Sequence, residues 1–357
     1  MKKILVIAAA ALAFAACTKS EVFNTGSAID FAPSALSTKA LVTGTTFPTD
    51  QTFNVFAFAD LNDNQGIDYS NPVMNDVVIS KATGDWKGVT TTAHPDPYMW
   101  TPTGIINFYA YYPSTLTATF SQTENADNVH KGLHLNSVDL GSTIGSQIDP
   151  LVACALSQSS EQKPTVAMAF KHITSQMAVY AYDATTIESL RGNIIITSVV
   201  FKNMKTVGTY TEGNVTGKGT WAPTNDVVNF TPYTNTSDAT LATTETNLSE
   251  NALFVVIPFA FTAADNVAIE VNYKTLAYTV NGFDYPATDV QTATIPLYGT
   301  YGNWSENFFS TGKRYVFHIG VTLDKASNEI VFAPSVDEWE SVNIDGITID
   351  AVHNTLI

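Results

Sequence analysis

Ile105-Ile-Asn-Phe-Tyr-Ala-Tyr-Tyr112-Pro113 is a run of β-branched and aromatic residues that ends at a proline. Residues of these types favour strands, and a proline at the end of such a run marks a turn. We therefore expect a strand over Ile105–Tyr112. The rest of the chain repeats this pattern of short apolar segments and turn residues, without sustained helical periodicity.

The other expected strands lie on both sides of this run. They cover Phe53–Ala59, Val77–Lys81, Leu133–Leu140, Leu151–Leu156, Thr165–Phe170, Ser175–Tyr182, Ile194–Lys202, Val227–Thr231, Leu253–Phe259, Ala268–Tyr273, Ala293–Leu297, Tyr315–Leu323 and Glu329–Phe332. A polar interval, Ser157–Pro164, divides them into two blocks and is the expected linker. The chain is thus predicted to be all-β, with one β-sandwich over residues 40–160 and a second over residues 161–341.

Composition limits the function. Hydrophobic residues make up 45% of the 357 residues, which is enough to build substantial cores. With 33 acidic and 17 basic residues the net charge is -16, which repels phosphate backbones and excludes nucleic acid as a partner. The two cysteines are Cys17 and Cys154. We expect Cys154 to be a small buried core residue without a disulfide partner.

Residues 1–16 are predicted to be an export signal. Two lysines precede an apolar run, Ile4–Phe14, that is too short to span a bilayer as a mature helix. The junction Phe14-Ala-Ala-Cys17 resembles the lipobox of bacterial lipoproteins, which implies cleavage before Cys17 and a covalent lipid on its sulfur as the only non-protein group. An ordinary signal peptide with an incidental cysteine is the alternative.

Residues 17–39 contain a short strand and a basic residue. Ala28-Ile-Asp-Phe-Ala32 alternates, so Ile29 and Phe31 are predicted to share one face, and Pro33 restricts the segment to a short or edge strand. Lys39 follows in a loop-like stretch and is a candidate site for a protease of tryptic specificity. The alternative is a solvated lysine without a role.

Residues 342–357 form a C-terminal extension with similar alternation. Ile347, Ile349 and Ala351 alternate with Thr348 and Asp350, which suits insertion into an apolar groove. The alternative is a final strand that pairs within its own domain.

Catalytic and metal-binding patterns are weak throughout. The sequence has no H-E-x-x-H motif, nucleophile elbow or phosphate-binding loop, so we expect neither an enzyme nor a metal site. Asp60-Leu-Asn-Asp-Asn-Gln-Gly66 is similar to a calcium loop, but its glycine falls one place late and the twelfth position is Asn71. A turn rich in Asp and Asn is the preferred interpretation. His172 is expected to be a hydrogen-bonded strand residue.

Three patterns together resemble the fimbrillin family, the type V pilins of Bacteroidetes. They are Tyr98-Met-Trp-Thr-Pro102 leading into Ile106–Pro113; Phe170-Lys-His-Ile-Thr-Ser175 with Met177 and Val179; and Gly312-Lys-Arg-Tyr-Val-Phe317 followed by Ile330–Phe332 and Trp339. Their order and spacing extend over nearly the whole chain. The aromatic residues in them are expected to pack in the cores.

The resemblance implies two tandem transthyretin-like β-sandwiches in a surface lipoprotein, held at the outer membrane by the lipid until maturation. A trypsin-like protease would cleave after Lys39 and displace the strand that carries Ile29 and Phe31. A donor strand from a neighbouring pilus subunit, carrying Ile347, Ile349 and Ala351, would then fill the groove. The function implied is a structural fimbrial subunit that supports adhesion at the cell surface. The alternative is a tip adhesin, or a non-polymerising lipoprotein that binds a glycan or host ligand.

Overall fold

A computed structural model describes residues 27–35, 47–60, 66–82, 84–125, 131–162, 164–299, 306–324, 340–350 and 355–356. Within these residues the chain is almost entirely β-structure, which confirms the predicted all-β class. The only helices among them are one short turn, α1 (Gln122–Asn125), and two 3-10 turns, η1 (Glu188–Leu190) and η2 (Ala263–Asp265). In the described part no helix is long and apolar enough to cross a membrane.

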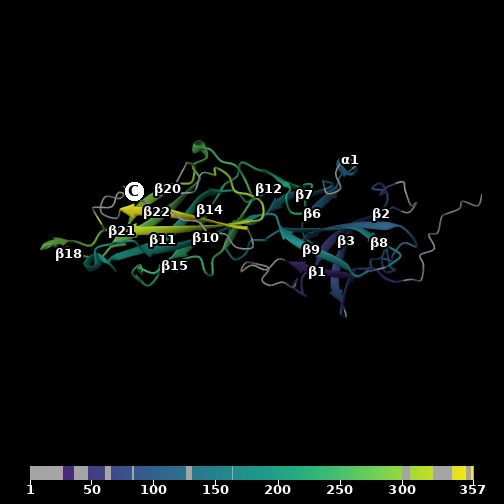
Figure 1. Ribbon diagram of the computed structural model, residues 1–357, viewed down its shortest axis with the longest axis horizontal. Helices are drawn as coiled ribbons and strands as arrows, with labels where there is room; N and C mark the ends of the chain where they lie inside the picture. Colours follow the sequence, from purple (N-terminus) through teal and green to yellow (C-terminus); the bar gives the residue numbers. More distant parts are fainter. Residues whose placement is uncertain are drawn as a thin grey trace, which may run out of the picture.

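Seven strands close into a barrel in the order β1-β4-β3-β2-β5-β8-β9, at one end of the elongated molecule (Figure 1). They are β1 (Phe31–Ala35), β2 (Phe53–Asp60), β3 (Pro72–Ala82), β4 (Asp85–Gly88), β5 (Ile105–Tyr112), β8 (Leu151–Ser159) and β9 (Val166–His172). The central pair, β2 and β5, is antiparallel with Asn54 opposite Tyr111 and Asp60 opposite Ile105. The run of β-branched and aromatic residues that predicted a strand is therefore a central barrel strand.

Alternate residues of β2 and β5 serve two different cores. Val55 and Phe108 belong to the apolar cluster inside the barrel. Phe56 and Tyr109 point outward and join a second cluster. Because both faces of these strands are buried, their sequences are mostly apolar instead of alternating with polar residues.

A four-stranded sheet covers the outer face of β2 and β5. Its order is β13-β12-β7-β6, with β6 (Thr117–Phe120), β7 (Leu133–Asp139), β12 (Val207–Thr211) and β13 (Thr220–Pro223). Leu135 of β7 and Tyr210 of β12 pack in the same cluster as Phe56 and Tyr109. β6 and β7 come from the first half of the chain and β12 and β13 from the second, so this sheet joins the two halves.

The remaining strands form a sandwich at the other end of the molecule (Figure 1). One sheet has the order β15-β10-β21-β22-β23, with β16 also paired to β10, and the other has the order β14-β11-β17-β20. Their bounds are β10 (Ser175–Asp183), β11 (Ile194–Met204), β14 (Val228–Thr234), β15 (Thr246–Asn247), β16 (Phe254–Val256), β17 (Ala268–Thr275), β20 (Gln291–Pro296), β21 (Lys313–Thr322), β22 (Glu340–Asp350) and β23 (Thr355–Leu356). A large apolar cluster that includes Phe201, Phe254 and Phe317 fills the space between the sheets. A separate hairpin, β18 (Tyr278–Val280) and β19 (Phe283–Tyr285), extends from this end.

Strand pairing does not follow the division predicted at residues 160 and 161. β9 lies after that boundary but pairs with β1 and β8 in the barrel. β12 also lies after it and pairs with β7. The predicted linker falls instead between two paired barrel strands, because Ser157–Ser159 belong to β8 and β9 follows at Val166. Turns between paired strands and interdomain linkers use the same residue types, so the sequence did not distinguish them.

Candidate functional site

The candidate site is the seat of β1 in the barrel. β1 runs parallel to β9, with Phe31 opposite Val166 and Ala35 opposite Phe170. On its other side it meets β4 antiparallel, with Phe31 opposite Trp86. The barrel closes only through β1, since β4 and β9 do not pair with each other. Loss of β1 would therefore turn β4 and β9 into two open edges.

Main-chain hydrogen bonds extend the seat to residues before β1. The Ile29 amide donates to the Tyr98 carbonyl at 2.9 Å, and the Val166 amide donates to the Asp30 carbonyl at 2.8 Å. Ala28 forms an antiparallel bridge with Met99. Backbone groups thus hold the strand on both sides. Such hydrogen bonds do not depend on side-chain identity, so another strand with suitable side chains can form them as well.

Ile29 and Phe31 lie in the core of the barrel, as the alternation predicted. Their exposed fractions are 1% and 3%. The Phe31 ring meets Phe53 and Phe108 edge to face, with centroids 6.1 Å and 5.6 Å apart. Val166 also contributes to this cluster. These two side chains act as structural core residues of the barrel although they lie near the start of the chain.

Lys87 of β4 lies beside the segment that leads into β1. Lys87 Nζ lies 3.5 Å from Asp30 Oδ1 and 3.1 Å from Asp85 Oδ2. The hydrogen bond to Asp85 and the charge of Asp30 raise the pKa of Lys87. Asp30 lies between Ile29 and Phe31, so its carboxylate points outward while its neighbours point into the barrel. Sequence reasoning missed Lys87, because only the pairing of β1 with β4 brings it to Asp30.

Phe47 is a second aromatic residue at the site that the sequence did not single out. It is 3% exposed and follows the segment that contains Lys39. Its ring lies 5.1 Å from Phe170, 5.4 Å from Trp86 and 5.5 Å from Phe53, measured between centroids. Phe47 therefore packs in the same core as Phe31 from the other side of Lys39.

The predicted donor residues Ile347 and Ile349 lie in β22. This strand runs parallel to β21 of its own sandwich, with Ile347 opposite Ile319 and Ile349 opposite Val321. Pairing within the same domain is the alternative that the sequence left open. Ala351, Cys17 and Lys39 lie outside the described residues, so their predicted roles stay predictions.

The other residues considered from the sequence have structural surroundings. His172 Nδ1 lies 2.7 Å from Asp149 Oδ2, so His172 is a hydrogen-bonded strand residue as predicted. Cys154 is a free thiol, partly buried, and burial raises its pKa. Residues 61–65 of the calcium-like segment lie outside the described part. Within the described part, no group of three or more His, Cys, Asp or Glu side chains could hold a metal ion.

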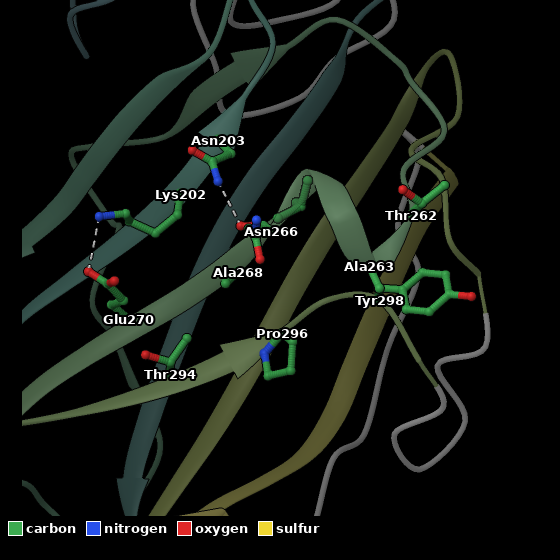
Figure 2. Close-up of a pocket in the computed structure, with 11 residues that line it drawn as sticks. Lys202, Asn203, Thr262, Ala263, Asn266, Ala268, Glu270, Thr294, Pro296 and Tyr298 are labelled. Carbon is green, nitrogen blue, oxygen red and sulfur yellow. Dashed lines mark hydrogen bonds and ion pairs between the residues drawn. The ribbon is translucent and has the colours of Figure 1, made fainter.

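A hollow of about 410 Å³ lies on the sandwich beside β11, β17 and β20 (Figure 2). Most of its polar side chains already have partners, either another side chain or a main-chain carbonyl. Lys202 Nζ pairs with Glu270 at 3.3 Å, and Asn203 Nδ2 donates to the Asp265 and Asn266 carbonyls at 3.1 Å and 2.8 Å. Tyr298, which also lines the hollow, is 43% exposed. The hollow is a weaker candidate than the seat of β1, because most of its polar groups are already satisfied.

The sequence model of the fimbrillin-like family matches residues 38–339. The chain belongs to the fimbrillin-like family. This membership supports a role as a fimbrial subunit or in adhesion, at the cell surface and in association with other fimbrial subunits, and it favours a structural role over catalysis. The match begins after β1 and ends before β22, so both candidate exchange strands of this fimbrillin-like protein flank the matched region.

Several solved structures are similar to this chain at low sequence identity, and the first of those named here shares its fold. A fimbrial protein from Bacteroides vulgatus is 14% identical, with a TM-score of 0.52 over 82% of this chain and 95% of that one. A fimbrial protein from Bacteroides ovatus is 14% identical, with a TM-score of 0.36 over 90% of this chain and 54% of that one. A protein assigned to cell adhesion from Bacteroides uniformis is 17% identical, with a TM-score of 0.48 over 84% and 95%. No curated protein sequence matches the chain.

Proposed function

We propose that this fimbrillin-like protein is a pilus subunit that polymerises by strand exchange. The observation that carries the proposal is that β1 closes the barrel, with Phe31 at its start and Ile29 two residues before it both buried in the core. β1 lies near the start of the chain and contributes core side chains. If it leaves the barrel, a similar strand must replace it to keep that core covered. Exposing two such side chains costs roughly 1.5–3 kcal/mol each.

The order of events follows from the position of β1. The lipid on Cys17 anchors the precursor to the outer membrane, and β1 keeps the barrel closed. A trypsin-like protease cleaves after Lys39, which disconnects β1 from Phe47. The freed seat then offers two strand edges and an apolar slot, and a strand from a neighbouring subunit fills it. Ile347, Ile349 and Ala351 of that neighbour supply the apolar side chains.

β22 is the proposed store of the donor. In the chain alone it pairs with β21, so exchange requires release from that partner. A parallel strand at this place suits the proposal, since β1 also pairs parallel with its neighbour β9. The donor would exchange one parallel partner for another and keep its backbone hydrogen bonds satisfied in both states.

The test is trypsin treatment of the purified chain from Thr18 to Ile357, followed by gel electrophoresis in SDS without boiling. The expected result is cleavage near Lys39 and a ladder of resistant oligomers. Lys39→Gln should prevent both. A chain that ends at Ser341 should be cleaved but should not assemble. Equal assembly of that shorter chain would show that the C-terminal segment is not the donor.

A second candidate function is a terminal subunit that accepts a donor strand without supplying one. The pairing of β22 within its own sandwich favours it, because a strand that stays on β21 is not available to a neighbour. Such a subunit would be cleaved near Lys39, would bind a synthetic peptide of residues 342–357, and would form no ladder by itself. The same gel therefore separates the two functions.

A further inference from the structure

The seat of β1 accommodates two side chains that point into the barrel and one that points outward. Ile29 and Phe31 are buried, whereas Ala32 is exposed and Asp30 is half-exposed. Phe31 is opposite Trp86 in the antiparallel pairing with β4, so the preceding residue, Asp30, faces Lys87, in agreement with their ion pair. Any strand that takes this seat therefore has one residue opposite Lys87 and its two neighbours in the core.

Strand geometry restricts how the C-terminal segment can enter. Successive side chains point to opposite faces, so a shift by one residue would place Thr348 and Asp350 in the core. Only shifts by two residues keep the isoleucines inside. The donor must also run parallel to β9, as β1 does, to use the same backbone groups.

Three placements remain, and they differ in what enters the two inward positions. In one, Asp345 takes the position of Ile29, which buries a carboxylate. In another, Ile349 takes the position of Ile29 and Ala351 that of Phe31, so a methyl group stands between Phe53 and Phe108. In the third, Ile347 and Ile349 take the two positions.

The second placement has one compensation, because it brings Asp350 opposite Lys87 in place of Asp30. Lys87 is 44% exposed at its side chain, and ion pairs between exposed groups contribute little. Filling the space between two buried rings with a four-carbon side chain instead of a methyl group contributes more. Packing therefore decides against the second placement.

We propose that the donor enters with Ile347 in the position of Ile29 and Ile349 in the position of Phe31, so that Thr348 faces Lys87. This inference rests on the strand exchange proposed above. It makes the ion pair between Lys87 and Asp30 a feature of the precursor alone. It also makes Ile349 the residue that determines how well the donor fits, because it occupies a space that a phenylalanine ring fills in the precursor.

Engineered cysteine pairs test this placement directly. The chain from Thr18 to Ile357 would carry Lys87→Cys together with Thr348→Cys, Asp350→Cys or Gly346→Cys, one pair for each placement. After trypsin treatment and mild oxidation, subunits joined at facing positions become covalently linked, since a disulfide forms only between closely opposed residues. Cys154, the other cysteine of this chain, is replaced by serine in every variant, so that only the engineered thiols can pair.

The expected result is that Lys87→Cys with Thr348→Cys gives about tenfold more covalent oligomer than either other pair. The matched control is Asp30→Cys with Lys87→Cys, which should retain β1 after cleavage and block assembly until reductant is added. Stronger linkage at Asp350 or Gly346 overturns the placement while leaving strand exchange intact. If the unmodified chain forms no ladder after cleavage, it does not supply a donor strand to its own copies, and the placement fails together with the proposed polymerisation.

A second measurement does not depend on disulfides. Ile349→Phe should refill the space of Phe31 and slow the dissociation of oligomers in SDS on heating by about tenfold. Ala351→Phe should give no such gain, because its side chain lies beyond the two inward positions. The reverse result, with Ala351→Phe stabilising the oligomers and Ile349→Phe weakening them, would place Ala351 between Phe53 and Phe108 and overturn the proposal.

Discussion

The rings of Phe31 and Phe108 meet edge to face, with centroids 5.6 Å apart and planes at 87°. Phe108 belongs to a central barrel strand, whereas Phe31 belongs to the strand that closes the barrel near the start of the chain. The contact joins a permanent part of the fold to the part that is proposed to leave. A substitution at Phe31 therefore measures how much β1 contributes to the stability of the barrel.

Phe31→Ala should lower the free energy of unfolding of the precursor by about 3–5 kcal/mol, because it leaves a cavity between Phe53 and Phe108. Urea denaturation monitored by tryptophan fluorescence measures this, since Trp86 and Trp100 lie in the same cluster. The matched control is Ala32→Ser at the neighbouring exposed position, which should stay within about 0.5 kcal/mol of the parent. Equal effects of the two changes would contradict the burial of Phe31.

Phe47→Ala should destabilise both the precursor and the cleaved chain, each by about 3–5 kcal/mol. The reason is that Phe47 follows Lys39 in the sequence and packs against Phe53 and Phe170. Phe31→Ala, by contrast, should leave the cleaved and assembled chain unaffected, because Phe31 is removed with β1. Thermal melts of each variant before and after trypsin treatment distinguish the two residues. If Phe47→Ala leaves the melting temperature of the cleaved chain unchanged, Phe47 does not remain packed in the barrel after cleavage.

Glu212 should make stability depend on pH. It follows β12, is 1% exposed, and accepts hydrogen bonds from the Gly213 and Gly217 amides and the Tyr210 hydroxyl. Burial raises the pKa of Glu212 from 4.5 to about 7. Between these two values the folded state holds a proton that the unfolded state has released. The free energy of unfolding should therefore fall as pH rises from 4.5 to 7, by on the order of 3 kcal/mol.

Glu212→Gln should remove most of that slope, because its uncharged amide has no proton to lose in this range. Urea denaturation at pH 5 and pH 8 is the measurement, and the variant should gain on the parent at pH 8. Exposed Glu250→Gln is the matched control and should leave the slope as it is. A parent chain more stable at pH 8 than at pH 5 would contradict the raised pKa of Glu212.

Asp149→Ala should destabilise the chain by about 3–5 kcal/mol, because it removes the partner of two buried groups. Asp149 accepts a hydrogen bond from Thr174 Oγ1 at 2.8 Å and lies 2.7 Å from His172 Nδ1. These residues lie where the barrel strand β9 leads into the sandwich strand β10. Chemical denaturation measures the loss, and exposed Asp289→Ala should have almost no effect. A small loss at Asp149 would mean that the cluster does not support this junction.

The strands that the sequence predicted best are those buried on both faces. The expected bounds of β5 agree with the structure, and those of β2 differ by one residue. The short strands β4, β6, β12 and β13 were missed. Each has only four or five residues, which is too few to show a clear pattern, and each is stable only when paired with a neighbouring strand. β4 nevertheless supplies Lys87 and Trp86, so the missed strand carries part of the candidate site.

Local pattern by itself determined the all-β class, the alternation that buries Ile29 and Phe31, and the resemblance to fimbrillins. These properties depend on residues within a few positions of one another, where the twofold periodicity of a strand is visible. The tertiary structure decided that β9 belongs to the barrel, that β1 closes it between β4 and β9, and that β22 lies on β21. The pairing of strands far apart in sequence depends on how the faces of complete sheets pack together. The sequence of a single strand does not indicate which sheet face it will contact.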